Sequence, residues 1–168
     1  MAESKKARIG FIGAGWWATS NHLPVFFDRD DVELVSVCRL GADELQRVKE
    51  EFGFRHATKN YLELLDTQDL DGVVVATPHG KHHEHAIAAL QRGLHVMCEK
   101  PLATTSADAR EMVQLADNQG VQLLVPHGWH YTPYVREARR RVADGSVGEV
   151  EFLQCHMASP LRGLLTGG

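Results

Sequence analysis

The sequence has few cysteines, no long hydrophobic run and no excess of positive charge. Its three cysteines, Cys38, Cys98 and Cys155, are odd in number and widely spaced, so none has a neighbour suited to a disulfide, redox or metal role. We therefore expect reduced, buried thiols. No apolar stretch approaches the length of about 18 residues that spans a bilayer. A net charge of −4 gives no attraction for nucleic acid or anionic lipid. These absences predict a cytoplasmic protein that binds neither nucleic acid nor a membrane.

Short apolar runs alternate with longer amphipathic stretches along the 168 residues, a length that holds one full domain and the beginning of another. The predicted strands cover residues 8–12, 32–38, 72–77, 95–98, 121–125 and 149–157. The predicted helices cover residues 42–52, 61–65, 79–92, 106–118 and 132–143. Strands that alternate with helices indicate right-handed βαβ crossovers. We therefore expect an α/β fold with a Rossmann-type, doubly wound parallel sheet.

A glycine-rich loop follows the first predicted strand. Its sequence, Gly13-Ala14-Gly15-Trp16-Trp17-Ala18, fits the dinucleotide-binding pattern G-x-G-x-x-[G/A]. In that pattern the first glycine permits a tight turn, and the second lets the backbone approach a pyrophosphate. The third position needs a small residue for helix packing, which Ala18 supplies. The loop predicts a cofactor site at residues 13–17, although such a turn also occurs for steric reasons alone.

The end of the second predicted strand bears on which dinucleotide is bound. An acidic residue there accepts a hydrogen bond from the ribose 2′-hydroxyl of NAD, whereas a basic residue accommodates the 2′-phosphate of NADP. The strand is followed by Arg39 and Leu40, and no acid occurs before Asp43. Arg39 is suited to a phosphate through its planar guanidinium, so NADP(H) is favoured over NAD(H). A solvated arginine in a surface loop is the alternative.

Several short motifs follow the glycine loop in order along the chain. They are His22-Leu23-Pro24, Ala76-Thr77-Pro78 with His82, Glu99-Lys100-Pro101, Tyr131-Thr132-Pro133 and residues 144–150. Together they resemble the Gfo/Idh/MocA family of oxidoreductases, the proteins similar to glucose–fructose oxidoreductase and inositol dehydrogenase. The resemblance covers essentially the whole chain, and Glu-Lys-Pro after a strand is its most specific element.

The resemblance implies roles for individual residues. Thr77, Pro78 and His82 would lie against the ribose and nicotinamide of the cofactor, and Glu99, Lys100 and Pro101 beside the nicotinamide. This agrees with the rule that ligands of open α/β sheets bind outside the carboxyl ends of the strands. Lys100 is the candidate catalytic residue, because a lysine there can bind the substrate hydroxyl and stabilise negative charge as hydride leaves.

The resemblance also implies a Rossmann domain over residues 1–125 and the start of a second α/β domain over residues 126–168. In the family that second domain holds the substrate, forms the oligomer interface and supplies an Asp and a His, the His acting as proton acceptor. No such pair follows in this sequence, so we expect a truncated polypeptide that is inactive alone and whose full-length form is a homo-oligomer. Many members carry an asparagine and arginines within the stretch that corresponds to residues 126–131, which this sequence lacks there. For His127 and His130, both substrate contact and ordinary packing remain open.

The prediction is therefore the cofactor-binding part of an NAD(P)-dependent oxidoreductase. It would move hydride between nicotinamide and a hydroxyl or carbonyl carbon of a small substrate, a sugar or polyol. A non-catalytic sensor or regulatory module is the alternative, since the family includes a fungal galactose-pathway repressor. Four histidines cluster at residues 79, 82, 83 and 85, but no cysteine accompanies them, and we predict no metal site.

Overall fold

The computed structural model describes residues 5–66 and 69–156. The chain divides into two compact units, one running to Pro126 and the other beginning at His127. Each unit is described by itself. No helix within the described ranges combines the length and apolar character needed to cross a bilayer.

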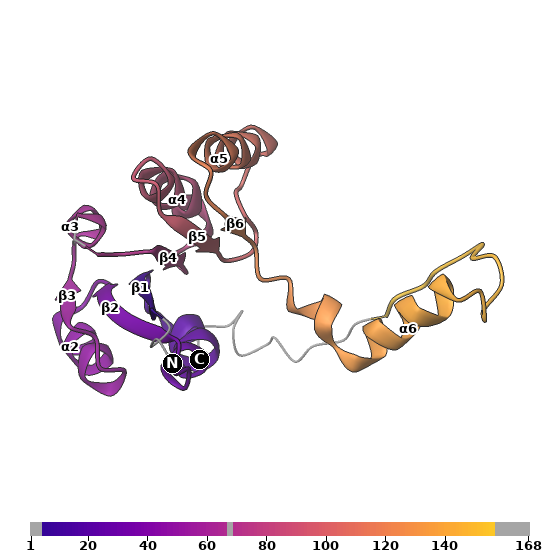
Figure 1. Cartoon of the computed structure of the whole chain (residues 1–168), viewed down its shortest axis with the longest axis horizontal. Coiled ribbons are helices and arrows are strands. Elements are labelled where there is room, and N and C mark those ends of the chain that lie inside the picture. Colours follow the sequence, from indigo (N-terminus) through magenta and orange to yellow (C-terminus); the bar gives the residue numbers. More distant parts are fainter. Residues whose placement is uncertain (1–4, 67–68, 157–168) are drawn as a thin grey trace. The chain divides into compact units, whose positions relative to one another are not determined.

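The first unit is built on a six-stranded sheet with the order β3-β2-β1-β4-β5-β6 (Figure 1). The strands are β1 (Ala7–Ile12), β2 (Val32–Cys38), β3 (His56–Thr58), β4 (Gly72–Val75), β5 (His95–Cys98) and β6 (Leu123–Leu124). All five pairings are parallel. The strand order reverses between β1 and β4, the place at which this fold binds its ligands. The predicted Rossmann-type sheet is confirmed.

Helices connect the strands and cover both faces of the sheet (Figure 1). They are a π-helical turn (Ala18–His22), α1 (Leu23–Phe27), α2 (Ala42–Glu51), α3 (Tyr61–Leu65), a 3-10 turn (His79–Lys81), α4 (His82–Leu90) and α5 (Ser106–Gln119). Side-chain caps start two of them. Asn60 accepts from the backbone N–H of Leu62 at the start of α3, and Thr105 accepts from that of Asp108 at the start of α5.

Neighbouring residues of one strand enter two separate hydrophobic clusters. Phe11 packs on the face that carries α1 and α2, whereas Ile12 packs on the face that carries α4 and α5. Val74 and Val75 divide in the same way. Because both faces are covered, these strands are apolar throughout rather than alternating. The clusters hold the strand ends, and so the loops that follow them, in fixed positions.

The structure differs from the sequence prediction in four elements of the first unit. Strand β3 was not predicted, because three residues are too few to reveal a period. The strand expected over 72–77 ends at Val75, and the strand expected over 121–125 is only Leu123–Leu124. The single helix expected over 79–92 is a 3-10 turn followed by α4. Elsewhere the predicted ranges hold to within a residue or two.

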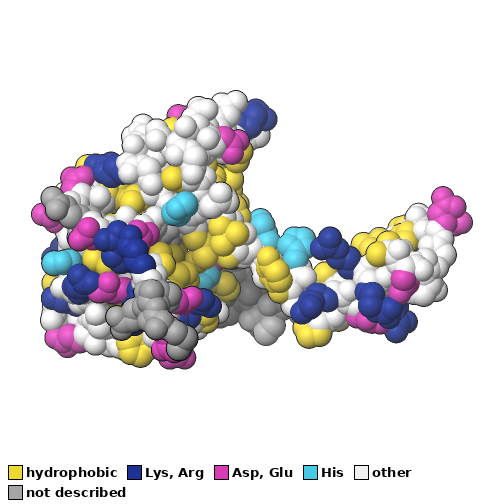
Figure 2. Space-filling model, in the orientation of Figure 1, with side chains coloured by type: hydrophobic (Ala, Val, Ile, Leu, Met, Phe, Trp, Pro, Cys, Tyr) yellow, Lys and Arg dark blue, Asp and Glu magenta, His cyan; other side chains and the backbone are white. Residues whose placement is uncertain are grey.

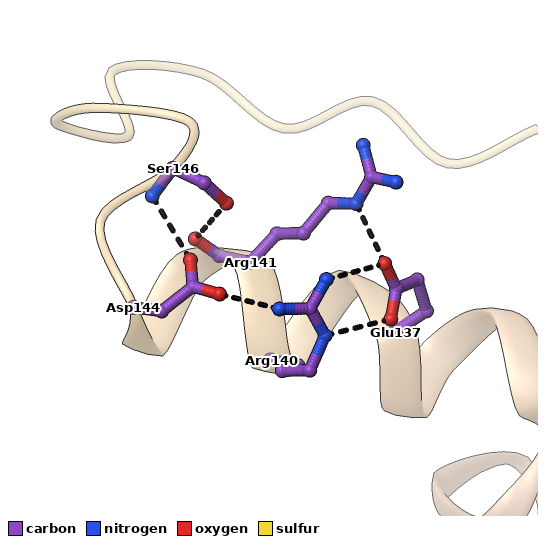
Figure 3. Close-up of polar contacts among 5 residues, drawn as sticks. All are labelled: Glu137, Arg140, Arg141, Asp144 and Ser146. Atoms are coloured by element: carbon purple, nitrogen blue, oxygen red, sulfur yellow. Dashed lines mark hydrogen bonds and ion pairs between the residues drawn. The ribbon is translucent and has the colours of Figure 1, made fainter.

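The second unit contains a 3-10 turn (Gly128–Tyr131) and α6 (Pro133–Ala143). At the end of α6 Arg140 bridges Glu137 and Asp144, and Arg141 donates to Glu137 (Figure 3). Hydrogen bonds from the two arginines lower the pKa of Glu137 to about 2. Two of the four arginines of α6 are therefore paired with carboxylates of the same segment.

The strand predicted over residues 149–157 is wrong for its described part. Residues 151–156 have no regular structure, and the segment 149–150 pairs with no strand either. A strand needs a neighbour to receive its backbone hydrogen bonds, and within the described part of this unit there is none. Met157 lies outside the described residues. Cys155 is consequently exposed, contrary to expectation, whereas Cys38 and Cys98 are buried as predicted.

Charged side chains of both signs are interspersed on the visible face of the first unit (Figure 2). One partly buried pair links the start of β1 to the start of β4, where Arg8 donates to Asp71 at 2.8 and 3.0 Å. Since β1 and β4 flank the point at which the strand order reverses, this pair reinforces the sheet at the end opposite the glycine loop.

Candidate functional site

A cavity of about 600 Å³ lies at the carboxyl ends of β1, β2 and β4. It is lined by Ile12, Gly13, Ala14, Gly15, Cys38, Arg39, Leu40, Lys59, Tyr61, Ala76, Thr77, Pro78, Lys81, Glu84 and His85. Six of the predicted site residues are thereby brought together, namely Gly13, Ala14, Gly15, Arg39, Thr77 and Pro78. The tertiary structure thus joins loops that are more than 60 residues apart in the sequence.

The two glycines of the loop differ in their surroundings. Gly13 has a φ of +91°, and a Cβ atom there would lie 2.7 Å from the carbonyl carbon and oxygen of Ala76. It is needed so that the loop after β1 can approach the loop after β4. A Cβ atom on Gly15 would meet nothing within 4 Å. Gly15 therefore leaves open space above the backbone on the cavity wall, while Ala14 and Ala18 are fully buried.

Arg39 lies at the rim of the cavity with its guanidinium folded back on the glycine loop. Its Nη1 donates to the carbonyl of Ala14 at 3.0 Å, its Nε donates to that of Leu40 at 3.1 Å, and its Nη2 is 3.8 Å from a Glu44 carboxylate oxygen. The side chain is 21% exposed, so the guanidinium is neither freely solvated nor completely enclosed by protein contacts.

Lys59 is a second cation at this rim, and sequence reasoning missed it. Strands β2 and β3 pair in parallel with Cys38 opposite Thr58, so the residues that follow them, Arg39 and Lys59, emerge side by side. The backbone N–H of Arg39 donates to the carbonyl of Thr58 at 3.3 Å. Among the described residues Lys59 makes no ion pair. Detecting it required strand β3, which the sequence pattern does not reveal.

A polar chain lines the wall formed by α3 and α4, and it was also missed. Glu84 accepts from the Tyr61 hydroxyl at 3.0 Å and from Lys81 at 2.8 Å. The rings of Tyr61 and His85 lie 4.4 Å apart, and His85 Nδ1 is 3.0 Å from the Thr77 hydroxyl. Burial lowers the pKa of His85, which Glu84 only partly opposes. This wall presents a neutral imidazole and an aromatic face at neutral pH.

His82 does not line the cavity but lies fully buried beneath it. Its Nδ1 lies 2.8 Å from the carbonyl oxygen of Pro101, and its Nε2 lies 2.8 Å from that of Thr77. Both ring nitrogens are thus directed at backbone carbonyls. The geometry ties the loop after β4 to the loop after β5, so His82 acts on the site through the backbone of both loops.

Glu99 is buried at the carboxyl end of β5, where it meets the helix that follows the glycine loop. Its Oε1 accepts from Trp17 Nε1 at 2.9 Å and lies 2.6 Å from His22 Nε2, and its Oε2 accepts from the backbone N–H of Lys100 at 2.9 Å. Trp16, Lys100 and Pro101 are exposed beside this cluster, and the peptide bond from Lys100 to Pro101 is cis.

Three of the four histidines at residues 79–85 are bonded to different partners. His82 and His85 bind the two loops as described, and His83 pairs with Glu111 at 2.9 Å. Among the described residues no group of three or more His, Cys, Asp or Glu side chains is arranged to hold a metal ion. The buried thiols are inert as well, because burial raises the pKa of Cys38 to about 11 and that of Cys98 to about 12.

Comparison with known proteins gives a consistent set of similarities. The family model GFO_IDH_MocA, described as an oxidoreductase family with an NAD-binding Rossmann fold, matches residues 7–127. The chain is 34% identical over 147 residues to D-glucoside 3-dehydrogenase of Escherichia coli (strain K12), covering 88% of this chain and 42% of that protein. It is 31% identical over 144 residues to D-apiose dehydrogenase of Paraburkholderia graminis, covering 86% and 38% respectively.

Solved structures agree with the sequence relatives. The crystal structure of myo-inositol 2-dehydrogenase from Lactobacillus plantarum superposes with a TM-score of 0.80 at 28% identity, covering 87% of this chain and 43% of that one. The chain thus spans less than half the length of the relatives it matches.

Proposed function

The chain belongs to the Gfo/Idh/MocA family of oxidoreductases, and we propose that it is the cofactor-binding part of an NAD(P)-dependent dehydrogenase that acts on a sugar or polyol. The observation that carries this proposal is the cavity at the point of strand reversal, with the glycine loop in its wall. Such a crevice is where Rossmann folds bind dinucleotides. The relatives support the catalytic function over a regulatory one.

The residues of the cavity fit a dinucleotide. The open space at Gly15 allows a pyrophosphate to approach the backbone, where the first N–H groups of a helix have no partner within the helix. Thr77 and Pro78 follow β4 on the opposite wall. The predicted cofactor-binding residues Trp16 and Trp17 directly follow Gly15. Glu99, Lys100 and Pro101 follow β5, the strand next to β4 in the sheet.

The choice of NADP(H) over NAD(H) is supported by charge at the rim. Arg39 and Lys59 stand at the carboxyl ends of adjacent strands, where the second strand of a Rossmann fold meets the adenosine ribose. A 2′-phosphate would be bound by the Arg39 guanidinium and the Lys59 ammonium together. The cavity-lining carboxylate of Glu84 is already hydrogen-bonded to Tyr61 and Lys81. Glu44 lies 3.8 Å from Arg39 but outside the cavity lining.

Lys100 is the proposed catalytic residue. The cofactor, when bound, supplies a hydride acceptor or donor at the nicotinamide ring. The Lys100 ammonium would donate a hydrogen bond to the substrate oxygen and stabilise negative charge there as the carbon–hydrogen bond breaks. The second unit would begin the substrate domain of a longer, homo-oligomeric enzyme, and that domain would supply the proton acceptor.

Calorimetric titration of the chain tests the cofactor assignment. NADPH should bind more tightly than ATP, which shares its adenosine and phosphates but lacks nicotinamide. Equal affinity for NADPH and ATP would refute the assignment of a nicotinamide cofactor to this chain. The regulatory alternative is tested separately by following NADP⁺ reduction with a panel of sugars and polyols in a protein that carries the downstream domain. Binding without turnover across that panel would favour a sensor.

A further inference from the structure

The cluster around Glu99 joins two segments that are 82 residues apart in the sequence. The Glu99 side chain is only 8% exposed, yet both of its oxygens have hydrogen-bond partners. Burial opposes its ionisation, but the hydrogen bonds from Trp17, His22 and the Lys100 backbone outweigh it and hold the pKa of the carboxyl below its usual value. A charged acceptor is therefore fixed beneath the Lys100 loop.

This acceptor determines how the Trp17 indole lies. The single N–H of the indole is its only strong hydrogen-bonding group, and Glu99 holds it at 2.9 Å. The ring then presents its face to the Lys100 ammonium, whose Nζ lies 4.6 Å from the ring centroid. A cation at that distance over an indole face is attracted by the negative potential of the ring.

The same geometry leaves the ammonium available. Lys100 Nζ is 4.0 Å from Glu99 Oε2, beyond hydrogen-bond distance, and the lysine side chain is 51% exposed. A direct hydrogen-bonded ion pair would occupy an N–H donor of Lys100. The indole face, with its centroid at 4.6 Å, and the carboxylate oxygen at 4.0 Å attract the cation without a hydrogen bond to any of its three N–H groups.

We propose that Trp17 and Glu99 are positioning residues that hold the Lys100 ammonium over the indole with its donors free for a substrate oxygen. The proposal rests on the function proposed above, in which Lys100 contacts the substrate. It concerns the chain without cofactor, so it is tested independently of cofactor binding.

The test uses NMR spectroscopy of the full chain carrying ¹³C-labelled lysine, without cofactor. A ring current from the Trp17 face should shift the Lys100 ε-methylene protons upfield from those of the other lysines. The signal is assigned by its loss in Lys100→Met. In Trp17→Leu it should return to the position of an exposed lysine. Trp16→Leu is the matched control, because Trp16 is the neighbouring indole and is not stacked on Lys100; there the shift should persist.

Two further variants keep the test decisive if Trp17→Leu fails to fold. Lys100→Met, at an exposed position, should move the ring signals of Trp17 and leave those of Trp16 in place. Glu99→Gln should also reduce the Lys100 shift. Trp17 and the Lys100 backbone donate to different oxygens of Glu99, and the amide replaces one of these oxygens with an NH₂ donor and removes the negative charge. Unchanged amide signals from the core would show that the fold is intact in each variant.

Persistence of the Lys100 shift in Trp17→Leu or in Glu99→Gln would overturn the proposal, as would its loss in Trp16→Leu alone. Failure of the proposed function looks different. If the wild-type chain bound NADPH no better than ATP, the cofactor assignment would fall while the Lys100 signal stayed where the aromatic contact puts it.

Discussion

The two glycines of the loop should respond in opposite ways to the same substitution. In Gly13→Ala the new Cβ atom meets the Ala76 carbonyl at 2.7 Å and the Thr77 methyl group at 2.6 Å, at a φ of +91°. A left-handed backbone costs a residue with a Cβ roughly 1–2 kcal/mol, and the clash adds to it, so we expect a loss above about 2 kcal/mol. In Gly15→Ala nothing lies within 4 Å, and the fold should be unchanged or about 0.4–1 kcal/mol more stable.

Binding should show the reverse difference. In the proposed binding mode, the methyl group of Gly15→Ala would occupy the space through which a pyrophosphate would approach the backbone. We expect NADPH affinity to fall about tenfold or more, which corresponds to about 1.4 kcal/mol. Urea unfolding followed by circular dichroism measures the free energy of unfolding, and calorimetry measures NADPH binding. The reasoning is refuted if Gly15→Ala unfolds as easily as Gly13→Ala, or if it binds NADPH like the wild type.

Three other changes test the rim, an ion pair and the core. Arg39→Asp should shift preference from NADPH towards NADH, and Lys59→Gln should weaken NADPH binding more than NADH binding; equal loss for both cofactors would contradict the 2′-phosphate assignment. The hydrogen bonds from Arg8 hold the pKa of Asp71 far below its usual value, so the ionised carboxylate stabilises the fold at neutral pH. That stability should be lost as pH falls below about 4, the pKa of an unfolded Asp, and Asp71→Asn should flatten this part of the urea-midpoint profile. Leu90→Ala, at a fully buried position, should lower the free energy of unfolding by about 2–5 kcal/mol, and a loss below 1 kcal/mol would show that the site collapses around the cavity.

The sequence alone was sufficient to predict the bounds of elements that have a recognisable local pattern. The runs at 32–38, 61–65 and 95–98 appear in the structure with the predicted bounds. Each is long or apolar enough to be recognised from local preferences. The run at 149–157 also has the composition of a strand, but composition cannot supply a neighbour for its backbone hydrogen bonds, and its described residues form no strand.

For this protein, the sequence by itself determined most elements of the first unit, the glycine loop and the family, because each is carried by short local patterns of residues. The tertiary structure decided which side chains meet. It placed Lys59 beside Arg39 through the pairing of β2 and β3, directed His82 at two backbone carbonyls, and brought Trp17 to Glu99. Such contacts depend on strand order and register, which are set by burial across the whole sheet rather than by local sequence.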